Sequence, residues 1–315
     1  MIETDIFEKI ISRHQGLFGG VSAQDISLVE PTSTNLIFFF QHSEKKYALK
    51  VMPYGAKIEF ATMEEAGKHI TVPKPLSYGQ IENDEYLLMQ LASGKNAQDV
   101  IPSAVAQMKM SFVDLSAKSL ARLHRSTLNI RESQKLKTNR LLNVDEVIKD
   151  LESHGIKDWS GISKLKLMGM EVSENGVCLV HGDYTPSNIM IDKHGLTGII
   201  DWEDAFWGSP LYDVGFSLFV FRTTGLDARL FLRSYIDEWS RPVQTDLNSH
   251  VINEPPKGIN EALPYYEALA AVEFYTFSIH AKQNPKIAKL MNQPSNAWQL
   301  KAITAAEKFI LELAS

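Results

Sequence analysis

The sequence predicts an α+β protein with a small β-rich N-terminal lobe and a larger, mainly helical C-terminal lobe. The first ninety residues hold short runs of β-branched and aromatic residues separated by polar turns, which is typical of strands. Beyond residue 103 the apolar residues recur at helical spacing. Ala92-Ser93-Gly94 interrupts the last apolar strand between these regions, so we expect domains at 1–91 and 92–315.

An amphipathic helix is expected at the start of the N-terminal lobe, over 2–15, because four isoleucines fall along one face. A second helix is expected over 57–69. It should end before Val72-Pro73-Lys74-Pro75, since proline cannot continue a helix. The strands of this lobe are expected at 26–29, 36–41, 47–52 and 86–91.

The C-terminal lobe should be built mainly of helices. They are expected near 103–127, 143–153, 158–171, 211–221, 226–239, 261–283 and 297–313. Short strands at 178–180, 189–191 and 197–200 interrupt them, and the residues from 242 to 260 suggest a loop.

Composition excludes several classes of protein. The single cysteine, Cys178, cannot form an intramolecular disulfide, and its apolar surroundings suggest a buried residue. No apolar run approaches the length of about 20 residues that a membrane helix needs, and the opening lacks a signal-peptide layout, so we expect a cytoplasmic protein without membrane contact. A net charge of −6 without a basic stripe argues against nucleic-acid binding.

Negative charge gathers in one region. Between residues 201 and 280 there are twelve Asp and Glu against five Lys and Arg. This excess is either a solvated acidic surface or a wall that attracts a cationic substrate.

The most informative segment runs from Val180-His181-Gly182-Asp183 to Asn188 and on to Asp201. An apolar strand ends at Asp183, and a loop too short for a helix leads to Asn188 at the start of the next strand. A second hairpin, turning at 193–195, should return Asp201 to the same edge. Two carboxylates and an amide oxygen at strand ends suit magnesium, and phosphoryl transfer needs such ligands together with a carboxylate that accepts the proton of the attacking hydroxyl.

Three linked motifs carry a family resemblance: His181-Gly182-Asp183 with Asn188, Ile200-Asp201-Trp202-Glu203, and Trp207 to Asp213. Together they resemble the aminoglycoside phosphotransferase family, part of the kinase-like fold with choline kinase. The resemblance implies a two-lobed protein-kinase-like fold. It also implies that Asp183 is the catalytic base, that Asn188 and Asp201 bind Mg²⁺, and that Asp213 buttresses the catalytic loop. His181 is expected to hold that loop in place.

If this assignment holds, the N-terminal lobe must supply a cation for the phosphates. Lys50 ends an alternating strand much as the conserved lysine does in protein kinases. Its carboxylate partner is expected to be Glu59, on the helix over 57–69, with Glu64 and Glu65 as alternatives. The choice of Glu59 rests on its spacing from Pro73, which resembles the family's.

Two further segments should contact the nucleotide. The loop over the phosphates is expected at 31–35; it holds no glycine, so the hydroxyls of Ser33 and Thr34 are candidates, and an ordinary hairpin turn is the alternative. The strand ending at Gln90 and Leu91 resembles the linker beside the adenine ring, where backbone groups would bind the base.

The expected function is transfer of the ATP γ-phosphate to a hydroxyl of a small, amine-bearing molecule, either an aminoglycoside-like antibiotic or a metabolite; GTP stays open as a donor. The alternatives are a protein kinase and a catalytically silent nucleotide-binding module. The short segment from Asp201 to Pro210 argues against protein substrates. A catalytically silent module is disfavoured because the expected polar set is intact, namely Lys50, Asp183, Asn188 and Asp201. Acceptor contacts are proposed at Glu203, Asp204 and Glu273, although Glu203 and Asp204 also fit solvated carboxylates.

Overall fold

The computed structural model describes residues 2–31, 35–128, 176–241, 254–284, 288 and 297–314. The expected helices at 143–153 and 158–171, and most of the expected loop at 242–260, lie outside the described residues. The chain forms two compact units. The first comprises Met1–Gly94 with Thr197–Glu203, and the second comprises Lys95–Leu196 with Asp204–Ser315. Residues 197–203, which the sequence analysis assigned to the C-terminal domain, pack with the first unit. The predicted α+β class is confirmed.

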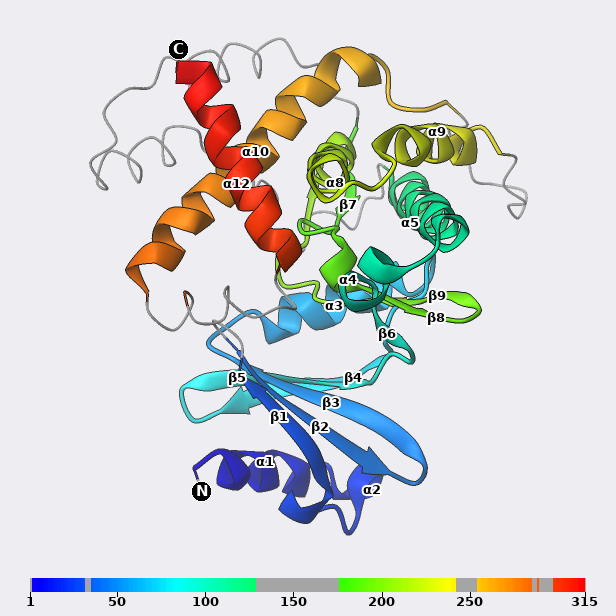
Figure 1. Cartoon of the computed structure of the whole chain (residues 1–315). Coiled ribbons are helices and arrows are strands. Elements are labelled where there is room, and N and C mark those ends of the chain that lie inside the picture. Colours follow the sequence, from blue (N-terminus) through cyan, green and yellow to red (C-terminus); the bar gives the residue numbers. More distant parts are fainter. Residues whose placement is uncertain are drawn as a thin grey trace. The chain divides into compact units, whose positions relative to one another are not determined.

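The first unit is built on a five-stranded antiparallel sheet with the order β1-β2-β3-β5-β4 (Figure 1). Its strands are β1 (Ile26–Pro31), β2 (Leu36–His42), β3 (Lys45–Met52), β4 (Pro75–Ile81) and β5 (Asp84–Gln90). Its helices are α1 (Ile2–Ser12), α2 (Gln15–Phe18), the 3-10 turn η1 (Ala23–Asp25) and α3 (Ala56–Ala66). Both predicted helices are shorter than expected, since α1 ends at Ser12 and α3 ends at Ala66, before Gly67.

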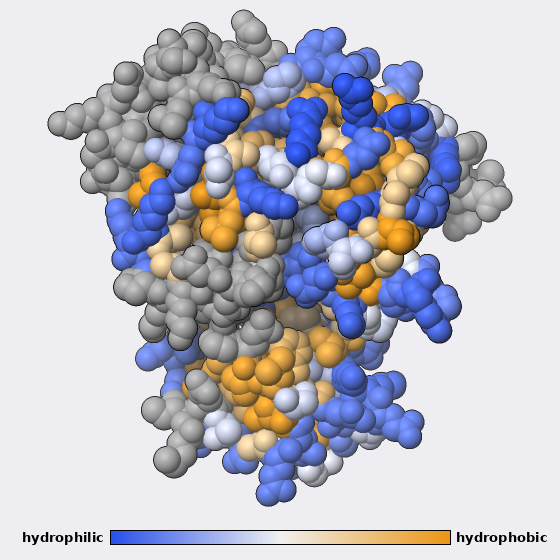
Figure 2. Space-filling model, in the orientation of Figure 1, coloured by the Kyte–Doolittle hydropathy of each residue, from blue (hydrophilic) through white to orange (hydrophobic). Residues whose placement is uncertain are grey.

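The alternation of side chains in β2 separates the two faces of this sheet. Phe38 and Phe40 point into a core that α1 closes, and the ring of Phe7 lies 5.5 Å from that of Phe38 and 5.3 Å from that of Phe40. Ile37 and Phe39 belong to the opposite face, where the register pairs Ile37 with Lys50. Hydrophobic residues gather over the strands of this unit in Figure 2. The same alternation that builds the core therefore places Lys50 on the other face of the sheet.

The second unit is mainly helical. Its helices are α4 (Ala97–Val100), η2 (Ile101–Ser103), α5 (Ala106–Thr127), η4 (Pro186–Asn188), α8 (Leu211–Thr224), α9 (Ala228–Trp239), α10 (Ile259–Gln283) and α12 (Ala297–Ala314). Its strands are β6 (Lys95–Asn96), β7 (Cys178–Val180), β8 (Ile189–Asp192), β10 (Phe206–Gly208) and the start of β9 (Gly195–Ile199). β10 pairs with β7, and β6 pairs with β8.

Helix α8 is the centre of this unit. Every residue from Leu211 to Phe221 is buried, so this helix is covered on all sides. It packs against α9 and α10, and α12 lies across α10 (Figure 1). Gly215 permits the close approach to α10, since a Cβ atom there would lie 2.7 Å from the backbone carbon of Tyr266. Among the residues that the structure describes, no helix is both long and apolar enough to cross a bilayer.

Candidate active site

The loop that follows β7 brings Asp183 and Asn188 together, as predicted from their spacing. The Asn188 side-chain nitrogen donates to the Asp183 Oδ2 atom at 2.8 Å and to its carbonyl oxygen at 3.0 Å. The loop holds one 3-10 turn, η4, which begins at Pro186, whose fixed φ favours the first position of a helix. Because the side-chain nitrogen of Asn188 donates to Asp183, the side-chain oxygen is the atom of Asn188 that could bind a cation.

Asp213, at the start of α8, holds the backbone on the other side of this loop. Its Oδ2 atom accepts from the amide of His181 at 2.8 Å, and its Oδ1 atom accepts from the amide of Gly182 at 2.9 Å. The loop needs glycine at 182, where φ is +87° and a Cβ atom would lie 2.9 Å from the carbonyl carbon of Asp204. Asp213 thus ties the backbone at residues 181 and 182 to the start of α8.

His181 itself is fully buried, and its Nδ1 atom accepts from the amide of Asp183 at 3.2 Å. Its ring therefore fixes the backbone at the position of the candidate base.

Sequence reasoning missed two residues behind Asp213. His124 on α5 lies 3.0 Å from Asp213 through Nε2 and 2.8 Å from the Tyr235 hydroxyl through Nδ1, and all three side chains are buried. The Asp213 carboxylate accepts from Nε2–H of His124. When the His124 ring is neutral, its Nδ1 atom is therefore an acceptor and the hydroxyl of Tyr235 donates to it. A signal existed, because His124 follows Leu120 and Leu123 on the apolar face of its predicted helix.

Lys50 is the centre of a cluster of charges in the first unit. Its Nζ atom lies 3.1 Å from Glu59 Oε2, 2.7 Å from Asp201 Oδ1 and 2.8 Å from Glu203 Oε2. Burial alone would lower the pKa of Lys50, but Asp201, Glu59 and Glu203 together raise it above its ordinary value. Lys50 therefore carries a fixed positive charge.

Glu59, and not Glu64 or Glu65, is the glutamate of α3 that reaches Lys50. Its side chain is 1% exposed, and its Oε1 atom also accepts from the amide of Trp202 at 3.3 Å. Burial raises the pKa of Glu59 to about 7, against the opposing effect of the Lys50 charge. The pair is thus a buried contact that orients the lysine head group.

Asp201 stands in a left-handed backbone conformation, with φ of +64°. Few residues other than glycine adopt it, and aspartate is one that tolerates it. Its side chain is 42% exposed. The described residues include no cluster of three His, Cys, Asp or Glu side chains that could hold a metal by themselves. The Asp201 carboxylate in the first unit and the Asn188 side-chain oxygen in the second are each of the ligand type that magnesium prefers, and magnesium often completes its shell with phosphates and water.

Part of the backbone at the end of the strand expected to lie beside the base is already hydrogen-bonded. The amides of Gln90 and Leu91 already donate to the carbonyls of Lys74 and Lys46, each at 2.9 Å. Neither N–H is therefore available to a purine. Within the described part of the chain, the amide of Ala92 is the next one along and makes no such bond.

The remaining predicted contacts lie in separate places. Ser33 and Thr34 fall outside the described residues, but Asn35, which follows them, is buried and donates from Nδ2 to Glu203 Oε2 at 2.7 Å. Glu203 belongs to the first unit, whereas Asp204 and Glu273 belong to the second. Glu273 accepts a hydrogen bond from the hydroxyl of Tyr212. The three proposed acceptor contacts are thus divided between the units.

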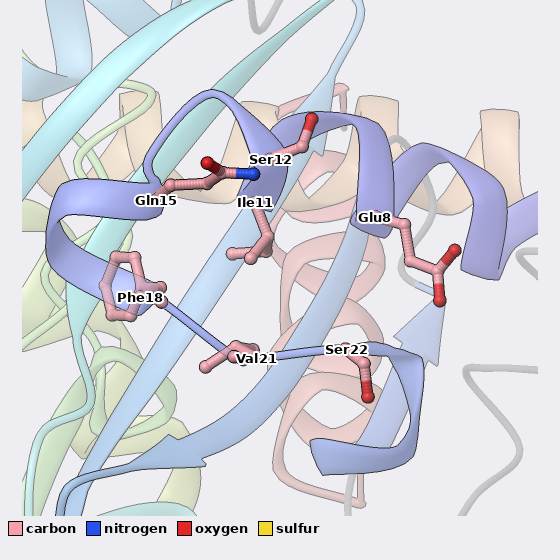
Figure 3. Close-up of a pocket in the computed structure, with 9 residues that line it drawn as sticks. Glu8, Ile11, Ser12, Gln15, Phe18, Val21 and Ser22 are labelled. Atoms are coloured by element: carbon pink, nitrogen blue, oxygen red, sulfur yellow. The ribbon is translucent and has the colours of Figure 1, made fainter.

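Two hollows on the surface contain none of these residues. One, of about 530 Å³, lies in the first unit beside α1 and α2, where Ile11, Phe18 and Val21 surround it and Glu8 is its only carboxylate (Figure 3). The other, of about 540 Å³, lies between α5 and the β8–β9 turn, lined by Phe112, Leu115 and His194 among others.

Comparisons with known proteins agree with these motifs. The rat protein "acyl-CoA dehydrogenase family member 11" (Rattus norvegicus) is 25% identical over 85% of this chain, and this chain spans 37% of that relative's length. A structure of a thermostable mutant of aminoglycoside phosphotransferase APH(4)-Ia matches 96% of this chain and 98% of its own, with 18% identity and a TM-score of 0.62. The structure of spectinomycin phosphotransferase APH(9)-Ia, in complex with ADP and spectinomycin, matches 95% of this chain and 98% of its own, with 13% identity and a TM-score of 0.62.

These structural matches confirm the predicted kinase-like fold. The model of the phosphotransferase enzyme family (APH) matches residues 25–242, which is more than half of the chain. This range includes Lys50, Asp183, Asn188, Asp201 and Asp213. The chain therefore belongs to the phosphotransferase enzyme family.

Proposed function

We propose that this protein transfers the γ-phosphate of ATP to a hydroxyl group of a small molecule. The observation that carries the proposal is the loop in which Asn188 fixes the carboxylate of Asp183 while Asp213 fixes the backbone before it. A carboxylate held in this way can orient a hydroxyl and take its proton. Lys50, oriented by Glu59, is the cation that would meet the phosphates.

In this mechanism Asp183 accepts the hydroxyl proton as the acceptor oxygen attacks the terminal phosphorus, and the bond from that phosphorus to the bridging oxygen breaks so that ADP leaves. Lys50 binds phosphate oxygens and offsets their charge. Asn188 and Asp201 would hold Mg²⁺, which offsets charge on the phosphates when it is bound. The amide of Ala92 and the half-buried side chains of Ile37 and Phe39, on the Lys50 face of the sheet, would bind the base. ATP is the proposed donor, and GTP is the alternative.

An amine-bearing hydroxyl compound is the first candidate acceptor. The acidic excess between residues 201 and 280 favours a cationic ligand, and carboxylates such as Asp204 and Glu273 can form charge-assisted hydrogen bonds with ammonium groups. Spectinomycin, bound in the structure of APH(9)-Ia, shows that a similar fold accepts such a compound. Aminoglycoside-like antibiotics and amino alcohols are therefore the first compounds to test.

A hydroxylated acyl thioester is the second candidate. The observation that favours it is the rat relative, whose name places it among acyl-CoA dehydrogenases and which aligns with 85% of this chain. Such an acceptor is anionic, so the acidic surface that attracts amines would repel it. The two candidates therefore predict opposite effects of salt on KM, since screening weakens attraction and repulsion alike.

The test is a screen for acceptor-dependent ADP formation, with amines, aminoglycosides, macrolides, sugars and hydroxyacyl-CoA thioesters, followed by mass detection of the phosphorylated product. With an acceptor in hand, Asp183→Asn should lower kcat by about 10²- to 10⁴-fold, the usual contribution of a general base, with nucleotide binding retained. Asp192→Asn, in the hairpin that follows, is the matched control and should keep full activity. An Asp183→Asn enzyme with unchanged kcat would contradict the assignment.

A further inference from the structure

The ammonium group of Lys50 has three N–H donors, and three carboxylates lie within hydrogen-bonding distance of it. Glu59, Asp201 and Glu203 each place an oxygen at 3.1 Å or less from Nζ. The proposed function, on which this inference rests, requires Lys50 to bind phosphate oxygens as well. A phosphate can take a donor of Lys50 only if one of the three carboxylates releases it.

Glu59 cannot easily be the one that leaves. Its side chain is 1% exposed and also accepts from the amide of Trp202, so a carboxylate that lost Lys50 would stay buried without its counter-charge. Breaking such a buried pair is costly. Glu59 therefore stays with Lys50 in either state.

Glu203 has the properties of an exchangeable partner. Its side chain is 36% exposed, so it can turn toward water without leaving a buried charge. Asp201, at 42% exposed, meets the same condition, but the proposed function keeps it beside the phosphates as a metal ligand. One further contact holds it on the lysine, because Asn35 donates to the same Oε2 atom at 2.7 Å. Asn35 directly follows residues 32–34, where the phosphate loop is expected. Glu203 thus bridges the lysine and the end of that segment.

We propose that Glu203 competes with nucleotide phosphates for Lys50 and thereby sets the affinity for the nucleotide. In the exchange, the Glu203 carboxylate turns outward and an oxygen of the phosphate chain takes its place on Nζ. No covalent bond changes. Glu203 acts as an internal anionic competitor, which is a different role from the acceptor contact expected from the sequence.

The test measures binding of ATP, and of inorganic tripolyphosphate as a base-free probe, by calorimetry in EDTA and again with Mg²⁺. Glu203→Gln removes the competing charge and should tighten metal-free binding of both ligands about fivefold, the size expected of a partly exposed ion pair. KM for ATP should fall in the assay while kcat changes little. Glu64→Gln, an exposed carboxylate on α3, is the matched control and should leave both affinities unchanged.

Three results would overturn the proposal. Equal or weaker metal-free binding by Glu203→Gln shows that Glu203 does not compete. Weaker binding only when Mg²⁺ is present shows instead that Glu203 is a metal ligand. If the wild type and every variant fail to bind either ligand, the proposed function itself fails, and this outcome differs from the first two. Glu203→Ala, which also removes the charge, gives the same measurement if the glutamine variant does not fold.

Discussion

Replacement of Asp213 by asparagine should both destabilise the protein and disable the catalytic loop. The carboxylate accepts from the amides of His181 and Gly182 and from Nε2 of His124, with all four groups buried. Asparagine has one acceptor oxygen, so its amide nitrogen must face at least one of these N–H groups. The other contacts lose the strengthening that a charged acceptor gives.

The magnitude follows from the contacts. A hydrogen bond to a charged group contributes about 1.5–3 kcal/mol, and a buried donor left unpaired costs about 1–3 kcal/mol. Relief from burying a charge offsets part of the loss, which leaves a net cost of roughly 3–5 kcal/mol for breaking such a buried network. At roughly 2–4 °C of melting temperature per kcal/mol for a unit of this size, Tm should fall by about 10 °C.

Thermal melts followed by circular dichroism measure this shift, and the acceptor-dependent assay measures kcat below the new Tm. Asp227→Asn is the matched control, since Asp227 caps α9 by accepting from Leu230 at 2.9 Å, and asparagine is an equally good cap. An Asp213→Asn protein that melts within about 2 °C of this control, or that keeps wild-type kcat, would refute the reasoning.

Two further predictions concern stability. The pKa of Glu59 is raised from 4.5 to about 7, so between these values the folded state holds a proton that the unfolded state releases, and the free energy of unfolding falls as pH rises through that window. From pH 4.5 to 7 the Tm of the wild type should therefore fall relative to that of Glu59→Gln. A difference in Tm that does not change with pH would contradict the assignment. Gly215→Ala should lower the free energy of unfolding by about 1–3 kcal/mol, because the added methyl group meets the backbone of Tyr266. Gly16→Ala is the control and should be neutral, since open space surrounds that position. Equal melting temperatures of the two variants would show that α8 and α10 can separate without cost.

The elements with strong sequence patterns were predictable, and the weak ones were not. The runs of aromatic and β-branched residues in β2 and β3 identified those strands within two residues. β4 was missed because it begins with Pro75 and contains Gly79, both typical of turns. Gly79 is required there for a tertiary reason, since a Cβ atom would lie 2.7 Å from the Tyr86 hydroxyl of the neighbouring strand. β10 is only three residues long and exists through its pairing with β7.

The same division applies to the candidate site. Asp183 and Asn188 lie five residues apart, and the sequence could predict their contact because one short loop joins them. The bridge from Glu203 to Lys50 joins segments far apart in the chain, and nothing in the local pattern of either segment predicts it. The hydrogen bonds that the backbone amides of Gln90 and Leu91 donate depend on the path of neighbouring segments, so the sequence alone could not predict them.

The first unit is discontinuous in sequence, since Thr197–Glu203 completes it. A gene fragment that stops after Gly94 would encode Lys50 and Glu59 but neither Asp201 nor Glu203. The lysine would then meet one carboxylate in place of three, and Trp202 would no longer donate to Glu59. Truncation at the apparent linker therefore removes part of the unit that it is meant to isolate. Any dissection of this protein should retain the seven-residue return segment, either by circular permutation or by supplying it as a separate peptide.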